Sequence, residues 1–360
     1  MSRLTVAIDA RLAGGSETGD TAYWSGLLHG LCQTDADARF LLFLNHEPEP
    51  KVPLDSRFEI VRVPARSGRI WSLVHFPLKA RAMGAQVIHT QYNLSPLVGD
   101  RGITTIHDVS FYVGPEWFKP RDLFLLQKFI PQAVRRAKKI LVVSHNTEKE
   151  LGEYIPESKG KCVVTYNALP VFFEPKTREQ ALPIVQRLGV EPPYVLTVGT
   201  RWPRKNMILA TDAMSLIGDA VPHKLVITGK PGWGDEMDDP RFQRVGYVTD
   251  EEIQALYACA DLYLAPSKNE GFGIPLLEAW ASDCPVLCSG APAFVEVAGK
   301  GCHVEPSWRP QHWADTIVSL LRDPSKLDLL RKRGRERLAH FSWKETGERT
   351  LNAYREVAGV

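Results

Sequence analysis

The chain has 360 residues, of which 44% are hydrophobic and 24% charged, and its formal net charge is +2. This length predicts two domains, and the composition is typical of a soluble globular protein. No apolar run reaches the roughly 18 residues that a membrane-spanning helix needs, and the N-terminus resembles a first strand rather than a signal peptide. The six cysteines form no C-x-x-C pair, which indicates reduced thiols and disfavours a structural zinc site. We therefore expect a cytoplasmic protein.

The first half of the chain alternates between short apolar segments and helical patterns. Helices are predicted at 23–32, 71–83 and 121–138. Such alternation favours a parallel sheet covered on both faces. The predicted strands are LTVAIDA, FLLFLN, FEIVRV, QVIHT, GITTIHD, ILVVS and CVVTY.

Positive charge gathers in this half, since residues 57–139 contain 14 Lys or Arg against 5 Asp or Glu. The helical stretch 120–139 also mixes leucine and phenylalanine with a basic end. This surface could face an anionic membrane or a phosphate-bearing acceptor. The alternative is a solvated basic face on a helix that simply covers the sheet.

The second half repeats the pattern after a proline-rich and charged segment that starts at Asn167. Helices are predicted at 207–217, 250–260, 274–281 and 312–321, and the tail from 326 onward is helical and charged. We expect an α/β fold of two doubly wound, Rossmann-like domains, 1–175 and 176–343, with a C-terminal helix at 344–360 that packs back on the first. Ligands should bind in a cleft beyond the carboxyl ends of the strands. The predicted strands are YVLTVGT, KLVITGK, RVGYV, LYLAPS, PVLCS and GCHVEP.

The segment SKNEGFGIPLLEAW follows one of these strands and places Glu270 and Glu278 on either side of a glycine-rich turn. Amides of residues 271–274 at the start of a helix are suited to phosphate oxygens, and the glycines allow close approach. Each carboxylate could then accept hydrogen bonds from hydroxyl groups, which predicts a sugar nucleotide as ligand. The alternative is that Glu278 complements the helix dipole and Glu270 is a surface loop residue.

The segment VGTRWPRKN ends another strand at Gly199 and continues into a basic loop with Arg201, Arg204 and Lys205. These cations could stabilise the growing charge on a nucleoside diphosphate leaving group, as a metal ion does elsewhere. A solvated turn is the alternative.

Polar residues also end strands of the first half. His107 and Asp108 follow one strand, and Ser144 follows another, with Asn146 as a plausible helix cap. Asn167 ends a third. A histidine in such a place is as consistent with a structural role as with a catalytic one.

Several motifs are missing. No strand is followed by G-x-G-x-x-G, and no P-loop sequence occurs, which disfavours a dinucleotide dehydrogenase and a P-loop enzyme. The sequence Asp35-Ala-Asp37 has the form of a metal-binding D-x-D, but it follows a helix and is interpreted as a solvated loop. We expect no metal, no cofactor and no nucleic-acid partner.

Together these motifs resemble retaining glycosyltransferase family 4, whose members have the GT-B fold. The segment EGFGIPLLE resembles the family's E-x7-E signature, and TIHDVSF, VVSHNTEKEL, VGTRWPRKN and VGYVTDEEIQALYACADLYLAPS follow in family order. The resemblance implies a nucleotide-sugar donor bound mainly by the second domain and an acceptor bound mainly by the first. It also implies same-face attack, in which the leaving phosphate helps to deprotonate the acceptor.

The resemblance implies roles for individual residues. Arg204 and Lys205 would bind the diphosphate, Glu270 and His107 the transferred sugar, and Glu278 the ribose. The base would rest on the backbone near 245–248. The expected catalytic residues are His107, Glu270, Arg204 and Lys205, and the expected donor-binding residues are Glu278, Gly271, Phe272, Gly273, Ile274, Gly199, Val248 and Asn167.

One turn departs from the family pattern. Relatives often carry G-G-x-G-R-Y after the first strand, and here Gly19 and Tyr23 fit, but Thr21 replaces a glycine and Ala22 the arginine. Asp20 adds a negative charge. Gly19, Asp20, Thr21 and Tyr23 are the expected acceptor or diphosphate loop, and these changes indicate a shifted donor, a rebuilt acceptor side or weak activity.

The first hypothesis is therefore a metal-independent, retaining enzyme that moves a hexose from GDP-mannose or a UDP- or dTDP-hexose to a glycan or lipid-linked acceptor. We expect it to work in the cytoplasm, with peripheral contact to the inner face of the membrane as the further expectation. The alternative is a low-activity sugar-nucleotide-binding subunit that partners another transferase. A sugar phosphorylase is disfavoured because no distinct lysine motif for pyridoxal phosphate is present.

Overall fold

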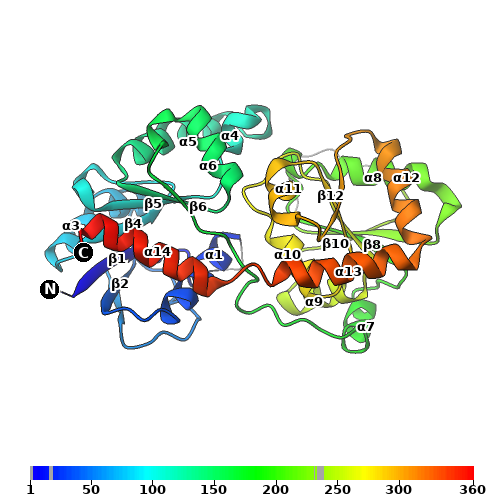
Figure 1. The fold of residues 1–360 in the computed structure, drawn as a ribbon, viewed down its shortest axis with the longest axis horizontal. Coiled ribbons are helices and arrows are strands. Elements are labelled where there is room, and N and C mark those ends of the chain that lie inside the picture. The colour runs from blue at the N-terminus through cyan, green and yellow to red at the C-terminus, as the bar shows by residue number, and fades with distance from the viewer. Residues whose placement is uncertain (1–2, 16–18, 231, 233–238) are drawn as a thin grey trace. The chain divides into compact units, whose positions relative to one another are not determined.

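The computed structural model describes residues 3–15, 19–230, 232 and 239–360. The chain divides into two compact units, Met1–Val171 with Phe341–Val360 (unit 1) and Phe172–His340 (unit 2) (Figure 1). The sequence pattern places the division between the two domains after residue 175, and it places the return of the chain to the first domain at residue 344. The difference has a local cause, because Phe173 packs against Tyr257 of unit 2 and Phe341 against Tyr166 of unit 1.

Unit 1 is built on a seven-stranded sheet in the order β3-β2-β1-β4-β5-β6-β7, and all its strand pairs are parallel. The order reverses between β1 and β4, which is the switch point where open α/β sheets bind ligands. The strands are β1 Leu4–Asp9, β2 Ala38–Leu44, β3 Phe58–Arg62, β4 Val87–Gln91, β5 Gly102–Ile106, β6 Lys139–Val142 and β7 Cys162–Val164.

Helices cover this sheet, and the predicted ones form with small shifts of their ends. The α-helices of unit 1 are α1 Gly19–Cys32, α2 Gly68–Ile70, α3 Phe76–Ala82, α4 Ser110–Val113, α5 Pro120–Arg136, α6 His145–Tyr154 and α14 Trp343–Ala358. Shorter turns are the π-helical η1 Trp71–His75 and the 3-10 segments η2 Pro96–Arg101, η3 Pro115–Trp117 and η4 Pro156–Ser158. The expected cap Asn146 is wrong, because Ser144 caps α6 by accepting from the Thr147 amide.

The last helix, α14, lies against α1 within unit 1 (Figure 1). The two helices cross at glycines, since a Cβ added to Gly30 would lie 1.9 Å from the Trp343 carbonyl oxygen. A Cβ added to Gly347 would lie 2.4 Å from the Gly30 carbonyl carbon. Backbone contact this close explains how a segment from the end of the chain belongs to the first unit.

Unit 2 is built on a six-stranded parallel sheet in the order β10-β9-β8-β11-β12-β13. Here the order reverses between β8 and β11, so the second switch point lies at the ends of these two strands. The strands are β8 Tyr194–Val198, β9 Lys224–Thr228, β10 Phe242–Gly246, β11 Leu262–Ala265, β12 Val286–Ser289 and β13 His303–Glu305.

The helices of unit 2 include two that the sequence pattern did not predict, α7 and α11. α7 begins inside the segment expected to be the domain boundary, where Thr177 and Gln180 form a capping box, and it contains Pro183. The α-helices are α7 Arg178–Arg187, α8 Met207–Ile217, α9 Asp250–Cys259, α10 Ile274–Ala281, α11 Pro292–Ala298, α12 Pro310–Leu321 and α13 Pro324–Leu338, with 3-10 turns η5 Pro203–Lys205 and η6 Gly218–Ala220. Among the described residues, no helix combines the length and apolar character needed to cross a membrane.

Candidate functional site

Two loops meet at the switch point of unit 2. One follows β8 and contains η5, and the other follows β11 and leads into α10. Arg204 joins them, because its guanidinium donates to the Asn269 carbonyl at 2.9 Å and its own carbonyl accepts from the Lys268 amide at 2.8 Å. Asn206, the N-cap of α8, has a left-handed conformation and donates from its side chain to the Pro266 carbonyl at 3.2 Å. The two strand ends are therefore held together by side chains of the basic loop.

Glu270 is the centre of this arrangement. Its carboxylate lies 2.8 Å from Nη1 of Arg204 and 2.6 Å from Nζ of Lys205, and its side chain is only 9% exposed. Burial alone would raise the pKa of Glu270, but the two cations lower it from the ordinary value of 4.5 to about 2. Glu270 is consequently ionised at neutral pH, and the cluster of two cations and one anion keeps a positive charge.

The turn before α10 places a helix N-terminus beside this cluster. Gly273 has a φ of 110°, and a Cβ there would lie 2.7 Å from the ring of Phe294, so no larger residue fits without a shift. Phe272 is buried, and α10 begins at Ile274 with Pro275 in its first turn. The partial positive charge of the helix end adds to that of the basic loop.

Glu278 lies in the second turn of α10, and its carboxylate accepts a hydrogen bond from a tyrosine. The hydroxyl of Tyr257 on α9 donates to Oε2 of Glu278 at 3.2 Å. Tyr257 is fully buried, and burial together with the Glu278 charge raises its pKa well above the ordinary value. The hydroxyl therefore keeps its proton and acts as a donor that orients the carboxylate.

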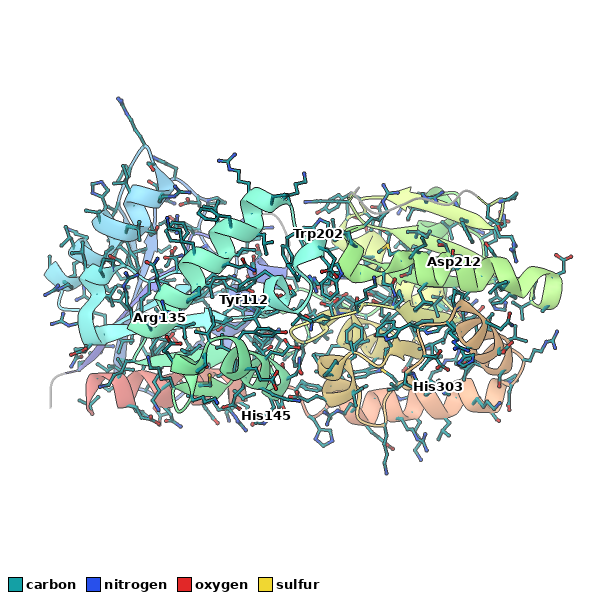
Figure 2. The ribbon with its side chains drawn as sticks, turned by 90° about the horizontal axis from the view of Figure 1, so that it is seen from above. Tyr112, Arg135, His145, Trp202, Asp212 and His303 are labelled. Atoms are coloured by element: carbon teal, nitrogen blue, oxygen red, sulfur yellow. The ribbon has the colours of Figure 1, made fainter. Side chains whose placement is uncertain are left out.

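The remaining expected donor-binding residues of unit 2 border the same sheet edge. Gly199 follows β8 with a φ of 137°. A Cβ added to it would point toward the aliphatic part of Lys205. Val248 is half-buried in the loop after β10, next to Tyr247, whose ring lies 4.9 Å from the ammonium of Lys230. Trp202, which is labelled in Figure 2, lies in the loop after β8. It is 40% exposed.

The expected residues of unit 1 form a second group at its own switch point. Nε2 of His107, after β5, lies 3.9 Å from Oδ1 of Asp20 at the start of α1. The ring of Tyr23 meets that of His107 edge-on at 4.6 Å. Burial lowers the pKa of His107, while Asp20 and Asp108 act in the opposite direction. The Thr21 side chain is buried in α1.

The expected sites therefore separate into two groups by unit. Asn167 belongs to unit 1, where it is 4% exposed, and not to the unit that holds the other donor-binding candidates. Gly19, the first residue of α1, has no atom within 4 Å of a Cβ added to it, so it has room for a side chain. No group of three or more His, Cys, Asp or Glu side chains that could hold a metal ion occurs in the described ranges.

Comparison with known proteins identifies the family. The sequence pattern of the family described as "Glycosyl transferases group 1" matches residues 192–323, which lie within unit 2. An O-antigen chain mannosyltransferase B from Escherichia coli is 30% identical over 268 residues, which cover 71% of this chain and 70% of the relative. This chain belongs to the group 1 glycosyltransferases.

Other matches agree with this assignment. The glycosyltransferase is 24% identical over 273 residues to the O-antigen chain mannosyltransferase RfbU of Salmonella typhimurium, with 72% of each chain covered. Among solved structures, a sucrose-phosphate synthase from Thermosynechococcus elongatus superposes with a TM-score of 0.71 at 17% identity, over 99% of this chain and 100% of that one. Anabaena HepE in complex with UDP and glucose gives 0.68 at 17% identity, over 98% and 99%. These likenesses confirm the predicted GT-B fold.

Sequence reasoning missed two residues that orient the predicted ones. Tyr257 lies inside a helix, and its spacing from Glu278 gives no signal of contact. Gln91 ends β4 and donates to Asp20 Oδ1 at 2.7 Å. The strand-end rule that selected His107 applies equally to Gln91 and would have found it.

Proposed function

We propose that this glycosyltransferase moves a hexose from a nucleoside diphosphate sugar to a hydroxyl of a glycan or lipid-linked acceptor, with retention and without a metal ion. The observation that carries this proposal is the cluster of Arg204, Lys205 and Glu270 at the switch point of unit 2, beside the N-terminus of α10.

The charge of the cluster supports a diphosphate as its ligand. Two cations against one carboxylate leave a positive site, and the helix end adds to it. Charge grows on the diphosphate as the glycosidic bond breaks, so fixed cations at this point stabilise the transition state more than the ground state. Arg204 and Lys205 would therefore do the work that a metal ion does in other transferases.

The two carboxylates support the groups on either side of the diphosphate. Glu278, oriented by Tyr257, is suited to accept hydrogen bonds from ribose hydroxyls. Glu270, ionised and buried, is suited to the hydroxyls of the transferred sugar. His107 of unit 1 is the remaining candidate for contact with that sugar.

Retention follows if the acceptor oxygen attacks the anomeric carbon from the face that the diphosphate leaves. The new bond joins the acceptor oxygen to the anomeric carbon, the bond from that carbon to the phosphate oxygen breaks, and the hydroxyl proton passes to the departing phosphate. This route needs no protein nucleophile.

The names of the relatives favour mannose. Two of them are O-antigen chain mannosyltransferases, so GDP-mannose is the first donor to test, with UDP- and dTDP-hexoses as the other candidates. A glycan or lipid-linked acceptor fits the same relatives.

Part of unit 1 is suited to a membrane surface. On α5, Phe124 is 62% and Phe129 37% exposed, and each ring lies within 6 Å of a cation, Lys128 at 5.5 Å and Arg69 at 5.9 Å. Aromatic rings beside basic side chains favour peripheral contact with an anionic bilayer.

A thermal-shift screen tests the donor site. GDP, UDP, dTDP and ADP and their common sugars are added to the wild type, to Lys205→Ala and to Lys300→Ala, a matched exposed lysine of unit 2. We expect one nucleotide to raise the melting temperature of the wild type and of Lys300→Ala but not of Lys205→Ala. No shift with any ligand would contradict the donor site. A shift without transfer to any acceptor would favour a binding subunit over an enzyme.

A further inference from the structure

A chain of side chains in unit 1 fixes the carboxylate of Asp20. The indole of Trp24 donates to Oε1 of Gln91 at 2.6 Å, and Nε2 of Gln91 donates to Oδ1 of Asp20 at 2.7 Å. Trp24 is fully buried and Gln91 nearly so. Because an indole can only donate, Gln91 must present its oxygen to Trp24 and its NH2 group to Asp20.

The carboxylate held in this way faces the ring of His107. Oδ1 of Asp20 lies 3.9 Å from Nε2 of His107, and this buried nitrogen makes no hydrogen bond within the described part of the chain. The ring itself is fixed by Tyr23, at 4.6 Å and nearly perpendicular, and by Tyr92 at 5.7 Å.

The Tyr23 side chain is itself held in place by a chain of hydrogen bonds. Its hydroxyl lies 2.9 Å from Oγ1 of Thr105, which lies 2.8 Å from Nε2 of His89, and Nδ1 of His89 lies 2.7 Å from the hydroxyl of Tyr354 on α14. Tyr23, His89 and Tyr354 are fully buried. The position of the His107 ring is therefore determined by the core of the unit.

Of the charged and titratable groups around His107, Asp20 is the one that decides which ring nitrogen carries the proton. Oδ1 of Asp108 already accepts from the amide and the hydroxyl of Ser110. Burial lowers the pKa of His89 to about 3, so it is neutral, and the tyrosines keep their protons. Burial also lowers the pKa of His107, so the ring carries a single proton at neutral pH.

A neutral imidazole has its proton on one nitrogen, and the nitrogen that faces a carboxylate is the favoured place. We propose that Asp20 is a positioning residue that holds the proton of His107 on Nε2 and leaves Nδ1 to accept a hydrogen bond from a hydroxyl of the bound sugar. The step to the sugar rests on the proposed function. The tautomer rests only on the geometry of unit 1. This role accounts for a carboxylate in the turn that departs from the family pattern.

The tautomer is measured directly by long-range 1H–15N correlation on the full chain with 15N-labelled histidine, at neutral pH and without substrate. The His107→Gln variant identifies the signals of His107. We expect the proton on Nε2 in the wild type and in Asp100→Asn, an exposed carboxylate of the same unit. In Asp20→Asn the amide oxygen keeps the bond from Gln91 at the place of Oδ1, but the negative charge that favours a proton on Nε2 is gone, so the tautomer with the proton on Nδ1 should gain population. A proton on Nδ1 in the wild type, or an unchanged tautomer in Asp20→Asn, would overturn the proposal.

A kinetic measurement tests the consequence for transfer. Asp20→Asn should lower kcat by about tenfold or more, with little change in the KM of the donor, because the donor cluster lies in unit 2. If the tautomer changes as expected while kcat stays at the wild-type value, the positioning role is wrong. If the wild type transfers no sugar from any donor, the proposed function fails, while the tautomer measurement still decides the role of Asp20 toward His107.

Discussion

The carboxylate of Glu270 lies 2.6 Å from the ammonium nitrogen of Lys205, although 64 residues separate them in the chain. The pair forms because β8 and β11 are neighbours in the sheet and their loops leave the same edge. With Arg204 it makes a site that is charged, nearly buried and built from two loops that stabilise each other.

Replacing Glu270 by Gln should separate its two roles. Two cations would lose their buried partner, which we expect to lower the unfolding free energy by about 3 kcal/mol. Transfer should fall by about 100-fold or more, because the sugar loses its ionised contact. Urea titration and initial rates measure the two effects. Glu191→Gln, an exposed residue of the same unit, should behave as the wild type.

The Glu270→Gln variant should also change the binding of a nucleoside diphosphate. Without Glu270 the cations are not neutralised, so a nucleoside diphosphate should raise the melting temperature of Glu270→Gln by more than it raises that of the wild type. An equal or smaller shift would mean that the diphosphate does not bind at these cations.

Tyr257→Phe should weaken the binding of the nucleotide without affecting the chemical step. The substitution removes one hydroxyl from a buried site and with it the hydrogen bond from Tyr257 to Glu278. A loss of about 1 kcal/mol corresponds to roughly a fivefold rise in Kd. Calorimetric titration checks this, with Tyr154→Phe, an exposed tyrosine of unit 1, as control. An unchanged Kd would show that Glu278 needs no such support.

Acid should destabilise the protein in two windows. The pKa of His89 falls from 6.5 to about 3 on folding, so the unfolded chain takes up its proton first and stability is lost as pH falls from 6.5 toward 3. The pKa of Glu270 falls from 4.5 to about 2, so its contribution is complete above 4.5 and is lost as pH falls toward 2. Each group contributes a slope of at most about 1.4 kcal/mol per pH unit.

Variants of the two residues show which group causes the loss of stability in each pH range. His89→Gln should flatten the decline of stability between about pH 6.5 and 4.5, and Glu270→Gln the decline below about 4.5, in urea titrations across that range. If His89→Gln leaves the upper window unchanged, another group must carry it.

Contact with a membrane depends on the aromatic side chains of α5. Phe124→Ser with Phe129→Ser should reduce co-sedimentation with anionic liposomes, because about 2 kcal/mol of apolar transfer is lost for each ring. Phe172→Ser, a partly exposed phenylalanine of unit 2, is the control. Equal binding to anionic and uncharged liposomes, or no binding at low salt, would contradict this contact.

Much of the fold could be predicted because strands of parallel sheets are short, apolar and separated by helices. Every predicted strand segment overlaps a strand, and α8 and α10 have the predicted ends. α7 was missed because it begins in the segment interpreted as the domain boundary, although the capping box at Thr177 was present in the sequence.

The partners of the predicted site residues were harder to predict. That Glu270 contacts Lys205 depends on strand order, which the pattern of strands and helices does not contain. Likewise Tyr354 reaches His89 only because α14 packs on α1 through Gly30 and Gly347. The sequence identified which side chains end strands, and the order of the strands decided which of them meet.

The most direct test of the donor site is a calorimetric titration with the nucleoside diphosphate sugar that the thermal-shift screen selects. We predict binding to the wild type and to Lys300→Ala with similar Kd, and a Kd raised by at least about tenfold in Lys205→Ala and in Glu278→Ala. Equal Kd values in all four proteins would contradict the assignment of the donor site to the loops after β8 and β11.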